Sequence, residues 1–593
     1  MLPDNKRPLR EGQAGCLGNN AKAFFVQKGG ATARPLFIPF LFLAINAFAA
    51  PGDGNDEFIR QQQRERALQQ REEKAQDVRL ESPELKLPTD KLPTGETPCF
   101  QIDRVTLNGD SAERFAWALA AMNGKDDSPI GRCLGSEGIN LVMKRVQNTL
   151  VAAGYVTTRV LAAPQDLKTG QLELTVVAGR IRQIRFAEGT SWRATRWNAF
   201  PMSDGDLLNL RDIEQALENL KRVPTAEADI QIAPAEGDDA KPGESDLVVT
   251  WRQALPLRLT LGADDSGSKA TGKYQGNVTV SGDNLLSLND LFYVTANRDL
   301  TDNNDHHGTR GTSLHYSIPV GYWQLAYNHS RYNYHQTVQG THQSYVYSGR
   351  STNQDIRLSR IVWRDAIGKT TLGLRGWSRE SQNYIDDTEV EIQRRRMAGW
   401  EINLAERLFI RDATLDANLA YRRGTGAMNA LPAPEENTGD GTSRPRLITA
   451  DLQFNQPFAL AGQRLRYNFT WRAQWNDTPL VPQDRFAIGG RYTVRGFDGE
   501  NLLSAERGWI IRNDLGFALG NSGQEAYLGL DYGHVGGPSA EQLIGTHLAG
   551  GVIGLRGALM GLNYDLFAGK PIDKPDGFRT AKTTAGFNLT WTF

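Results

Sequence analysis

Alternation of apolar and polar residues dominates the chain from residue 252 to its end. The clearest stretch is RLRYNFTWRAQW, residues 464–475, which places arginines and amides on one face. The other face carries Leu465, Tyr467, Phe469, Trp471, Ala473 and Trp475. A period of two residues predicts β-strands that have one apolar and one polar face. Weaker alternation recurs over residues 290–298, 313–320, 399–406, 413–421 and 585–593.

Such strands suit either a soluble β-sandwich or a membrane barrel. A sandwich of about 340 residues would usually divide into several domains. In a bilayer the sheet must close on itself, because lipid offers no partner to the N–H and C=O groups of an edge. Sixteen strands would leave about 21 residues for each strand and its connection, which is typical of membrane barrels. We therefore predict an all-β transmembrane barrel of about 16 antiparallel strands over residues 252–593.

The N-terminal residues have the pattern of an export signal. Residues 36–48, LFIPFLFLAINAF, form a long apolar run that follows basic residues and ends at the small-x-small triplet Ala47–Ala49. This predicts a signal peptide over residues 1–49. The alternative is an N-terminal anchor helix, but about 13 apolar residues fall short of the roughly 20 that span a bilayer.

A polar helix and a linker are predicted next. Asp56–Leu80 has no Gly or Pro and is rich in Gln, Glu, Arg and Lys, which favours a helix. Its few apolar residues form no continuous stripe, so the helix is expected to lie in water or in a watery cavity. A solvated, partly frayed helix is the alternative. We assign residues 50–80 to this segment and residues 81–97, which contain three of the four prolines spaced between 83 and 98, to an extended linker.

Two small α/β units are predicted in tandem, each with the order β-helix-β-β. In the first unit, residues 98–178, strands are expected at 100–109, 155–162 and 171–179, and a helix at 136–154. In the second unit, residues 179–251, strands are expected at 180–186, 228–235 and from 245 onward, and a helix at 210–223. The repeat is one of architecture rather than of sequence.

Charge and cysteine content narrow the possible functions. The chain has 67 basic and 68 acidic side chains, so it has no general attraction for a polyanion, and no nucleic-acid partner is predicted. Cys16 would leave with the signal peptide, whereas Cys99 and Cys133 remain. In an exported chain this pair predicts a disulfide, with two buried free thiols as the alternative. All eight histidines follow residue 300, so no metal site is predicted at the cysteines.

The sequence lacks the common motifs of nucleotide-binding and hydrolytic enzymes. The sequence has no P-loop of the G-x-x-x-x-G-K-[ST] type, and no G-x-S-x-G or H-E-x-x-H motif. His534 lies beside Asp531 in an alternating stretch, which indicates a strand residue rather than a catalytic base. We therefore predict no enzymatic activity and no cofactor.

The order of these elements resembles the two-partner secretion transporters, which are outer-membrane exporters of haemolysins, filamentous adhesins and contact-dependent inhibition toxins. The likeness covers nearly the whole mature chain. Residues 99–109, 132–160 and 164–181 resemble the first POTRA module of the family, including its paired cysteines, and residues 208–223 and 243–249 resemble the second. In the barrel, YTVRGFDG (492–499) resembles the VRGY/F signature, and LGLDYGHV (528–535) resembles the F/L-x-D-x-G signature.

The resemblance implies a function. The POTRA modules would lie in the periplasm and bind the N-terminal secretion domain of a partner exoprotein. The polar helix would rest in the pore as a plug, and the barrel would export the partner to the cell surface or medium without ATP. The barrel would contact outer-membrane lipid. Its last strand, ending at Phe593, would be recognised by the barrel assembly machinery.

The resemblance also implies a site inside the barrel. The tip of a long extracellular loop, made of Val494, Arg495, Gly496 and Phe497, would fold back into the lumen and meet a wall motif made of Leu530, Asp531 and Gly533.

The alternation in residues 525–535 agrees with such a site, because it points Asp531 inward, between small residues that leave room for a loop. Arginine and a carboxylate can then form a bidentate pair. Asp498 and Glu500 are alternative local partners of Arg495, and a solvated hairpin tip is a further alternative.

Two other functions fit part of this pattern. A POTRA-containing factor that assembles other barrels has a similar loop, but such factors usually have more POTRA modules and lack the plug helix. A diffusion porin would have no use for two periplasmic modules. Protein export is therefore the predicted function.

Overall fold

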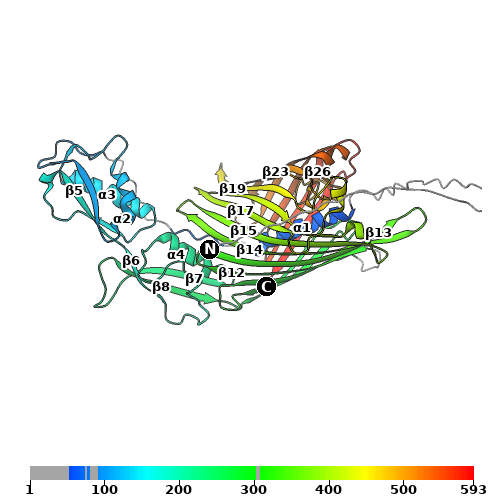
Figure 1. Ribbon diagram of the computed structural model, residues 1–593, viewed down its shortest axis with the longest axis horizontal. Helices are drawn as coiled ribbons and strands as arrows, with labels where there is room; N and C mark the ends of the chain where they lie inside the picture. The colour runs from blue at the N-terminus through cyan, green and yellow to red at the C-terminus, as the bar shows by residue number, and fades with distance from the viewer. Residues whose placement is uncertain (1–52, 74–75, 81–90, 302–306) are drawn as a thin grey trace, which may run out of the picture. The chain divides into compact units, whose positions relative to one another are not determined.

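A computed structural model describes residues 53–73, 76–80, 91–301 and 307–593 (Figure 1). The predicted signal peptide, residues 1–49, lies outside the described residues. The described chain comprises one long helix, two small α/β modules and a closed β-barrel.

Helix α1 spans Asp53–Glu72, and residues 76–80 have no regular structure. The helix predicted up to Leu80 was therefore wrong at its C-terminal end. The backbone N–H groups of Val78 and Leu80 donate to Glu218 and Glu214, at 3.1 and 2.9 Å. Because these tertiary bonds satisfy the backbone, the segment does not need a helix for this purpose.

The first α/β module contains a three-stranded sheet in the order β2-β5-β4. Strands β2 and β5 are parallel, and β4 and β5 are antiparallel. Helix α3 packs on the sheet through the fully buried Val142, Val146 and Leu150. The elements are β1 Phe100–Ile102, β2 Arg104–Gly109, α2 Ala112–Phe115, η1 Ala116–Met122, β3 Arg132–Leu134, α3 Ser136–Ala152, β4 Arg159–Leu161, η2 Leu167–Thr169 and β5 Gln171–Val177.

Two strand predictions in this module differ from the structure. The single strand predicted over 100–109 is divided at Asp103, because β1 pairs with β3 whereas β2 pairs with β5. The N–H groups of Asp103 and Arg104 both donate to the carbonyl of Gly170, at 2.7 and 3.1 Å, which marks the change of partner. The strand predicted over 155–162 is reduced to the three residues of β4.

The second module repeats this topology. Its sheet has the order β6-β8-β7, with β6 and β8 parallel. Helix α4 is buried on its polar side as well as its apolar side, because Gln215 and Asn219 donate to the carbonyl of Gly321 in a barrel turn, at 3.3 and 2.8 Å. The elements are β6 Arg180–Phe186, α4 Leu210–Leu220, β7 Ala226–Pro234 and β8 Glu244–Gln253.

Sixteen antiparallel strands form the closed barrel, as predicted, with the two-residue β16 as an addition at one hairpin. The first strand, β9, pairs with the last, β27, to close the wall. The strands are β9 Leu257–Asp264, β10 Gln275–Asp283, β11 Leu291–Asp299, β12 His307–Val320, β13 Trp323–Gln339, β14 Ser344–Arg364, β15 Gly368–Ile385, β16 Thr388–Glu389, β17 Arg395–Ile410, β18 Ala413–Thr425, β19 Arg446–Leu460, β20 Gln463–Asn476, β23 Arg507–Ala518, β24 Glu525–Gly536, β25 His547–Leu559, β26 Leu562–Asp573 and β27 Thr584–Thr592.

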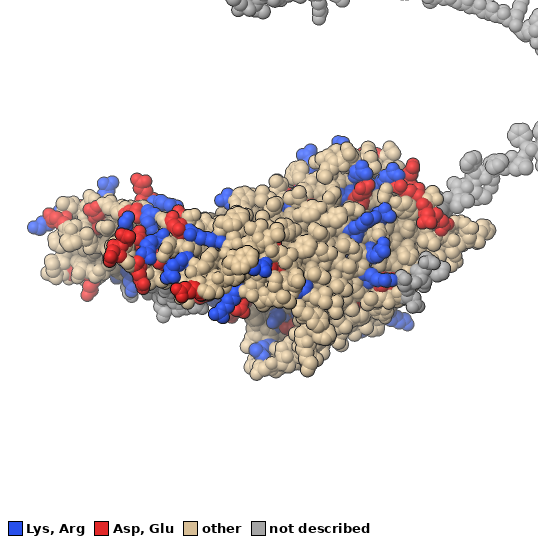
Figure 2. All heavy atoms as spheres, turned by 90° about the horizontal axis from the view of Figure 1, so that it is seen from below, with Lys and Arg blue, Asp and Glu red and all other residues tan. Residues whose placement is uncertain are grey.

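The wall has an apolar outer face. In β24 the exposed Leu528, Leu530 and Tyr532 alternate with buried residues, among them Gly529 and Asp531. Figure 2 shows one side of the barrel on which Lys, Arg, Asp and Glu side chains are sparse along the middle of the wall. Within the described ranges, no helix is long and apolar enough to cross a membrane.

Candidate functional site

Helix α1 lies among the barrel strands (Figure 1). Its polar side chains bind residues of the barrel wall. The fully buried carboxylate of Glu57 accepts hydrogen bonds from Arg64, Thr271 and Tyr332, at 2.7, 2.8 and 2.5 Å. A buried carboxylate needs such donors, because burial without them would be strongly unfavourable. Further contacts with the wall are Glu72 with Arg258 and Ser281, Glu73 with Tyr293, and Phe58 with Arg379.

The loop between β20 and β23, residues 477–506, also enters the barrel. Its stem is a short hairpin of β21, Phe486–Ile488, and β22, Leu503–Ala505. Val494 and Phe497 at the tip are buried in an apolar cluster with residues of the stem and the wall. The rest of this cluster is Phe486, Ile488, Leu503, Ala505, Ile510, Val535, Leu548 and Phe578.

Arg495, between these two anchors, is held by the wall. Its Nε and Nη2 donate to the two oxygens of Asp531, each at 2.7 Å, and its backbone N–H donates to the same carboxylate at 2.9 Å. Its Nη2 also lies 2.5 Å from Oδ1 of Asp514. Arg495 is 5% exposed and Asp531 is 4% exposed. The arrangement is a bidentate, buried ion pair with a second carboxylate beside it.

Glycines of the wall allow the tip to approach. A Cβ on Gly529 would lie 2.7 Å from Nη2 of Arg495, and a Cβ on Gly533 would lie 2.8 Å from Cγ2 of Val494. A Cβ on Gly550 would overlap the carbonyl oxygen of Arg495. The absence of side chains at these three positions therefore lets the loop tip pack directly against the wall.

The other charged residues near the tip have different partners. Asp498 accepts from Thr580 and from the N–H of Ala581, and Glu500 accepts from the N–H of Lys269. Neither pairs with Arg495. Of the predicted wall motif, Asp531 and Gly533 meet the tip, whereas Leu530 lies on the exposed outer face.

Sequence reasoning missed Asp514 as a partner of Arg495. The signal was present in β23, because alternation along that strand places Arg512 and Asp514 on one face. The β23–β24 register then sets Arg512 opposite Asp531 and Asp514 opposite Gly529. Only the register, which the sequence does not reveal, brings the second carboxylate to the tip.

Comparison with known proteins identifies the family. The family model of the haemolysin secretion/activation proteins ShlB/FhaC/HecB matches residues 243–557, which is more than half of the chain. The chain belongs to this family of outer-membrane transporters. A POTRA model of the ShlB type matches residues 100–179, and a second POTRA model matches residues 180–234.

Individual relatives agree with this family. The outer membrane transporter CdiB-2 of Burkholderia pseudomallei is 38% identical, over 92% of this chain and 96% of that protein. The hemolysin transporter protein ShlB of Serratia marcescens is 25% identical, over 70% of this chain and 72% of that protein. The structure of CdiB from Acinetobacter baumannii is similar with a TM-score of 0.80 at 29% identity, covering 91% of this chain and 99% of that one. The predicted family, fold and outer-membrane location are confirmed.

The helix and the loop touch each other in the lumen of this transporter. Nη2 of Arg60 on α1 donates to the carbonyls of Gly499 and Glu500 in the loop, at 2.8 and 3.3 Å. Arg379 of β15 binds Asp484 of the loop, two residues before β21, through two hydrogen bonds and also lies over the ring of Phe58. The two occupants of the lumen are therefore held by shared contacts.

A charged wall faces the open side of α1. A cavity of about 740 Å³ lies between the helix and the wall. Arg66 of the helix lines it, and so do wall ion pairs of arginine with acidic residues. These pairs are Arg375 with Asp355, Arg422 with Glu401, and Arg472 with Asp451, at 2.9, 2.8 and 2.7 Å. Cations and anions alternate, so this part of the lumen is polar without a strong net charge.

The periplasmic end of the transporter contains a second polar cluster. Glu218 of α4 accepts from Arg364 at 2.9 Å and lies 3.1 Å from Lys369, while Arg364 also donates to the carbonyl of Val78 at 3.0 Å. Burial raises the pKa of Glu218, but the hydrogen bond from Arg364 and the charge of Lys369 outweigh it. The net effect is a pKa below its usual range. The cluster joins residues 76–80, the second POTRA module and the barrel.

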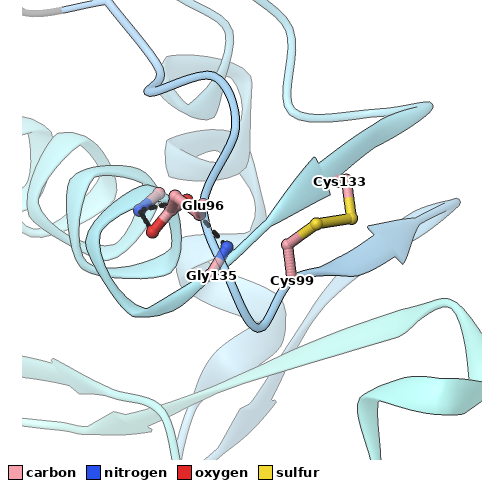
Figure 3. Close-up of a disulfide and its surroundings, with 5 residues drawn as sticks. Glu96, Cys99, Cys133 and Gly135 are labelled. Carbon is pink, nitrogen blue, oxygen red and sulfur yellow. Dashed lines mark hydrogen bonds between the residues drawn. A yellow bond between two sulfur atoms is a disulfide. The ribbon is translucent and has the colours of Figure 1, made fainter.

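Two interactions fix residues 96–99, the segment that leads into β1 of the first POTRA module (Figure 3). Cys99, just before β1, forms a disulfide with Cys133 of β3. Three residues earlier, the carboxylate of Glu96 accepts from the N–H groups of Gly135 and Glu137, at 2.7 and 2.9 Å. These N–H groups are the unpaired donors at the start of α3, where a carboxylate is favourable.

Proposed function

We propose that this transporter binds the N-terminal secretion domain of a large exoprotein through its POTRA modules and exports the chain through its barrel without ATP. The main support is the lumen itself. Both of its occupants, α1 and the loop tip, are attached by hydrogen bonds, ion pairs and apolar contacts to the wall. Apart from the chain continuity of the loop with β20 and β23, the described residues show no covalent cross-link between these occupants and the wall, so an entering chain can displace them.

Displacement of α1 is chemically reasonable because the helix is polar. Its sequence, DGNDEFIRQQQRERALQQRE, is mostly charged or amide-bearing. In water these groups recover hydrogen bonds in place of those made to the wall, so the net change is small for each exchanged bond. An apolar plug would instead expose hydrocarbon on leaving, at about 25 cal/mol per Å².

Passage without ATP fits the chemistry of the wall. The alternating ion pairs along the cavity present donors and acceptors to an extended backbone but no dominant charge that would trap it. We infer that folding of the cargo outside the cell provides the direction. A toxin of the contact-dependent inhibition type is the first candidate cargo, because a CdiB protein shares the higher identity, 38% against 25% for the haemolysin transporter.

Two further roles complete the proposal. The tip Val494–Phe497 acts as a lumenal anchor that docks on Asp531 and Gly533. The last strand, β27, which precedes Phe593, is the segment that the barrel assembly machinery recognises in the membrane.

Co-expression with an adjacently encoded large exoprotein tests this function. The cargo should appear in the medium or on the cell surface with the transporter, and should stay in the periplasm without it. Arg495→Ala should reduce export while the barrel level stays normal. Arg411→Ala, in the exposed turn between β17 and β18, is the matched control. Full export by Arg495→Ala, at a normal barrel level, would refute the role of the tip.

A further inference from the structure

The loop that joins β6 to α4 in the second POTRA module rests on two turns of the barrel. Asn198, which is fully buried, donates through Nδ2 to the carbonyls of Leu288 and Pro319. Its Oδ1 accepts from Asn289 at 3.0 Å, and its carbonyl accepts from the N–H of Gly321 at 2.8 Å. The loop is therefore fixed to the β10–β11 and β12–β13 turns at the periplasmic rim.

Two tryptophans in this loop are exposed. Trp192 is 86% exposed and Trp197 is 64% exposed. Each is adjacent in sequence to a residue that binds the rim, because Arg193 donates to the carbonyl of Asn284 and Asn198 binds as described above. Large aromatic side chains held at fixed positions in water usually indicate an interaction surface.

The neighbouring rim is also apolar and exposed. Leu285 and Leu286, in the β10–β11 turn, and Trp323, at the start of β13, are exposed. Oγ of Ser281 lies 3.5 Å from Glu72 in the lumen, so the next residue, Gly282, faces outward. The side chain of Leu285 lies over Gly282, since a Cβ there would overlap it. The turn thus continues the lipid-facing wall.

We propose that this loop is a membrane anchor. Trp192 and Trp197, together with Leu285 and Leu286, lie among the phospholipid headgroups of the inner leaflet of the outer membrane. Tryptophan prefers this depth, because its ring is apolar and its N–H can bond to headgroups or water. The surface is continuous with the outer face of the barrel, which lipid covers. Anchoring would hold the second POTRA module against the barrel rim.

Site-specific labelling of the full mature chain in phospholipid nanodiscs tests the anchor. Trp192→Cys and Trp197→Cys are each labelled with an environment-sensitive fluorophore, and quenching by lipids that carry a nitroxide near the headgroup is measured. Cys99 and Cys133 form a disulfide and do not react. Trp117→Cys, at a residue 48% exposed on the first POTRA module, is the matched control.

Quenching at 192 and 197 should exceed quenching at 117 by about threefold or more. Ser191→Cys keeps both tryptophans and serves as a second reporter if either substitution impairs folding. Equal quenching at all labelled positions overturns the proposal. Labels that respond to an added secretion domain of the cargo, and not to the quencher lipids, also overturn it and assign the surface to the secreted chain.

Discussion

Removal of the Arg495 guanidinium is the sharpest perturbation of the lumenal site. Arg495→Ala deletes two hydrogen bonds to Asp531 and one to Asp514. It leaves Asp531 buried in the wall without its main counter-ion. The backbone N–H at position 495 still donates to Asp531, and Nε of Arg512 lies 3.8 Å from it, so some compensation remains.

The magnitude follows from these contacts. Removing one partner of a buried ion pair costs about 3–5 kcal/mol. Because the backbone donor and Arg512 remain, we expect the lower end, about 3 kcal/mol, which is about 100-fold in the docking equilibrium of the loop. Arg495→Ala with Asp531→Ala should cost less than the sum of the single changes, because the double variant leaves no unpaired carboxylate at Asp531.

Thiol accessibility measures this equilibrium. Thr493, two residues before the tip arginine, is 3% exposed. Thr493→Cys should react slowly with an impermeant maleimide when the loop is docked. The rate should rise about 100-fold when Arg495→Ala is added, and should be unchanged by Arg411→Ala. A rise of less than about threefold would show that apolar contacts, and not the ion pair, hold the tip.

Three further outcomes are expected. Deletion of 53–72 should increase single-channel conductance in planar bilayers, since α1 occupies the lumen; unchanged conductance would contradict the plug assignment. Replacing Cys99 and Cys133 by serine should lower the unfolding free energy of the first POTRA module by about 4 kcal/mol, given a separation of 34 residues, as measured by pulse proteolysis. Because the pKa of Glu218 is lowered in the folded protein, its ionised carboxylate stabilises the cluster at pH values above the unfolded pKa. This stabilisation is lost as the pH falls through the folded pKa. Cleavage at residues 76–80 should therefore increase below about pH 4, and Glu218→Gln should abolish this pH dependence.

The barrel and the inward carboxylate were predictable because both depend on a period of two. Alternation along β24 alone places Asp531 in the lumen, whatever the neighbouring strands are. Predictions from local helix propensity were less accurate where tertiary contacts compete with the helix. The helix predicted to Leu80 ends early because Glu214 and Glu218 bind the backbone of residues 76–80, and α4 lies far away in the sequence.

Contacts that depend on strand register lay beyond sequence reasoning. Asp514 meets the tip only because β23 and β24 pair in one particular register. Gly550 accommodates the carbonyl of Arg495 only because β25 follows in its own register. Neither residue belongs to a motif that marks it. The exposed tryptophans of the second POTRA module likewise become informative only when the turns beneath their loop are known.

The loop also contacts the seam where β9 and β27 close the barrel. The loop, the seam and α1 are therefore connected through direct contacts. Arg491 pairs with Asp265, just after β9, at 2.6 Å and donates to the carbonyl of Phe587 in β27 at 3.1 Å. The same loop binds Arg60 of α1. Each such bond is made by a charged group and contributes about 1.5–3 kcal/mol net. Several contacts of this size together hold the loop in its docked state, so loss of the helix contact weakens the hold of the loop on the wall and the seam.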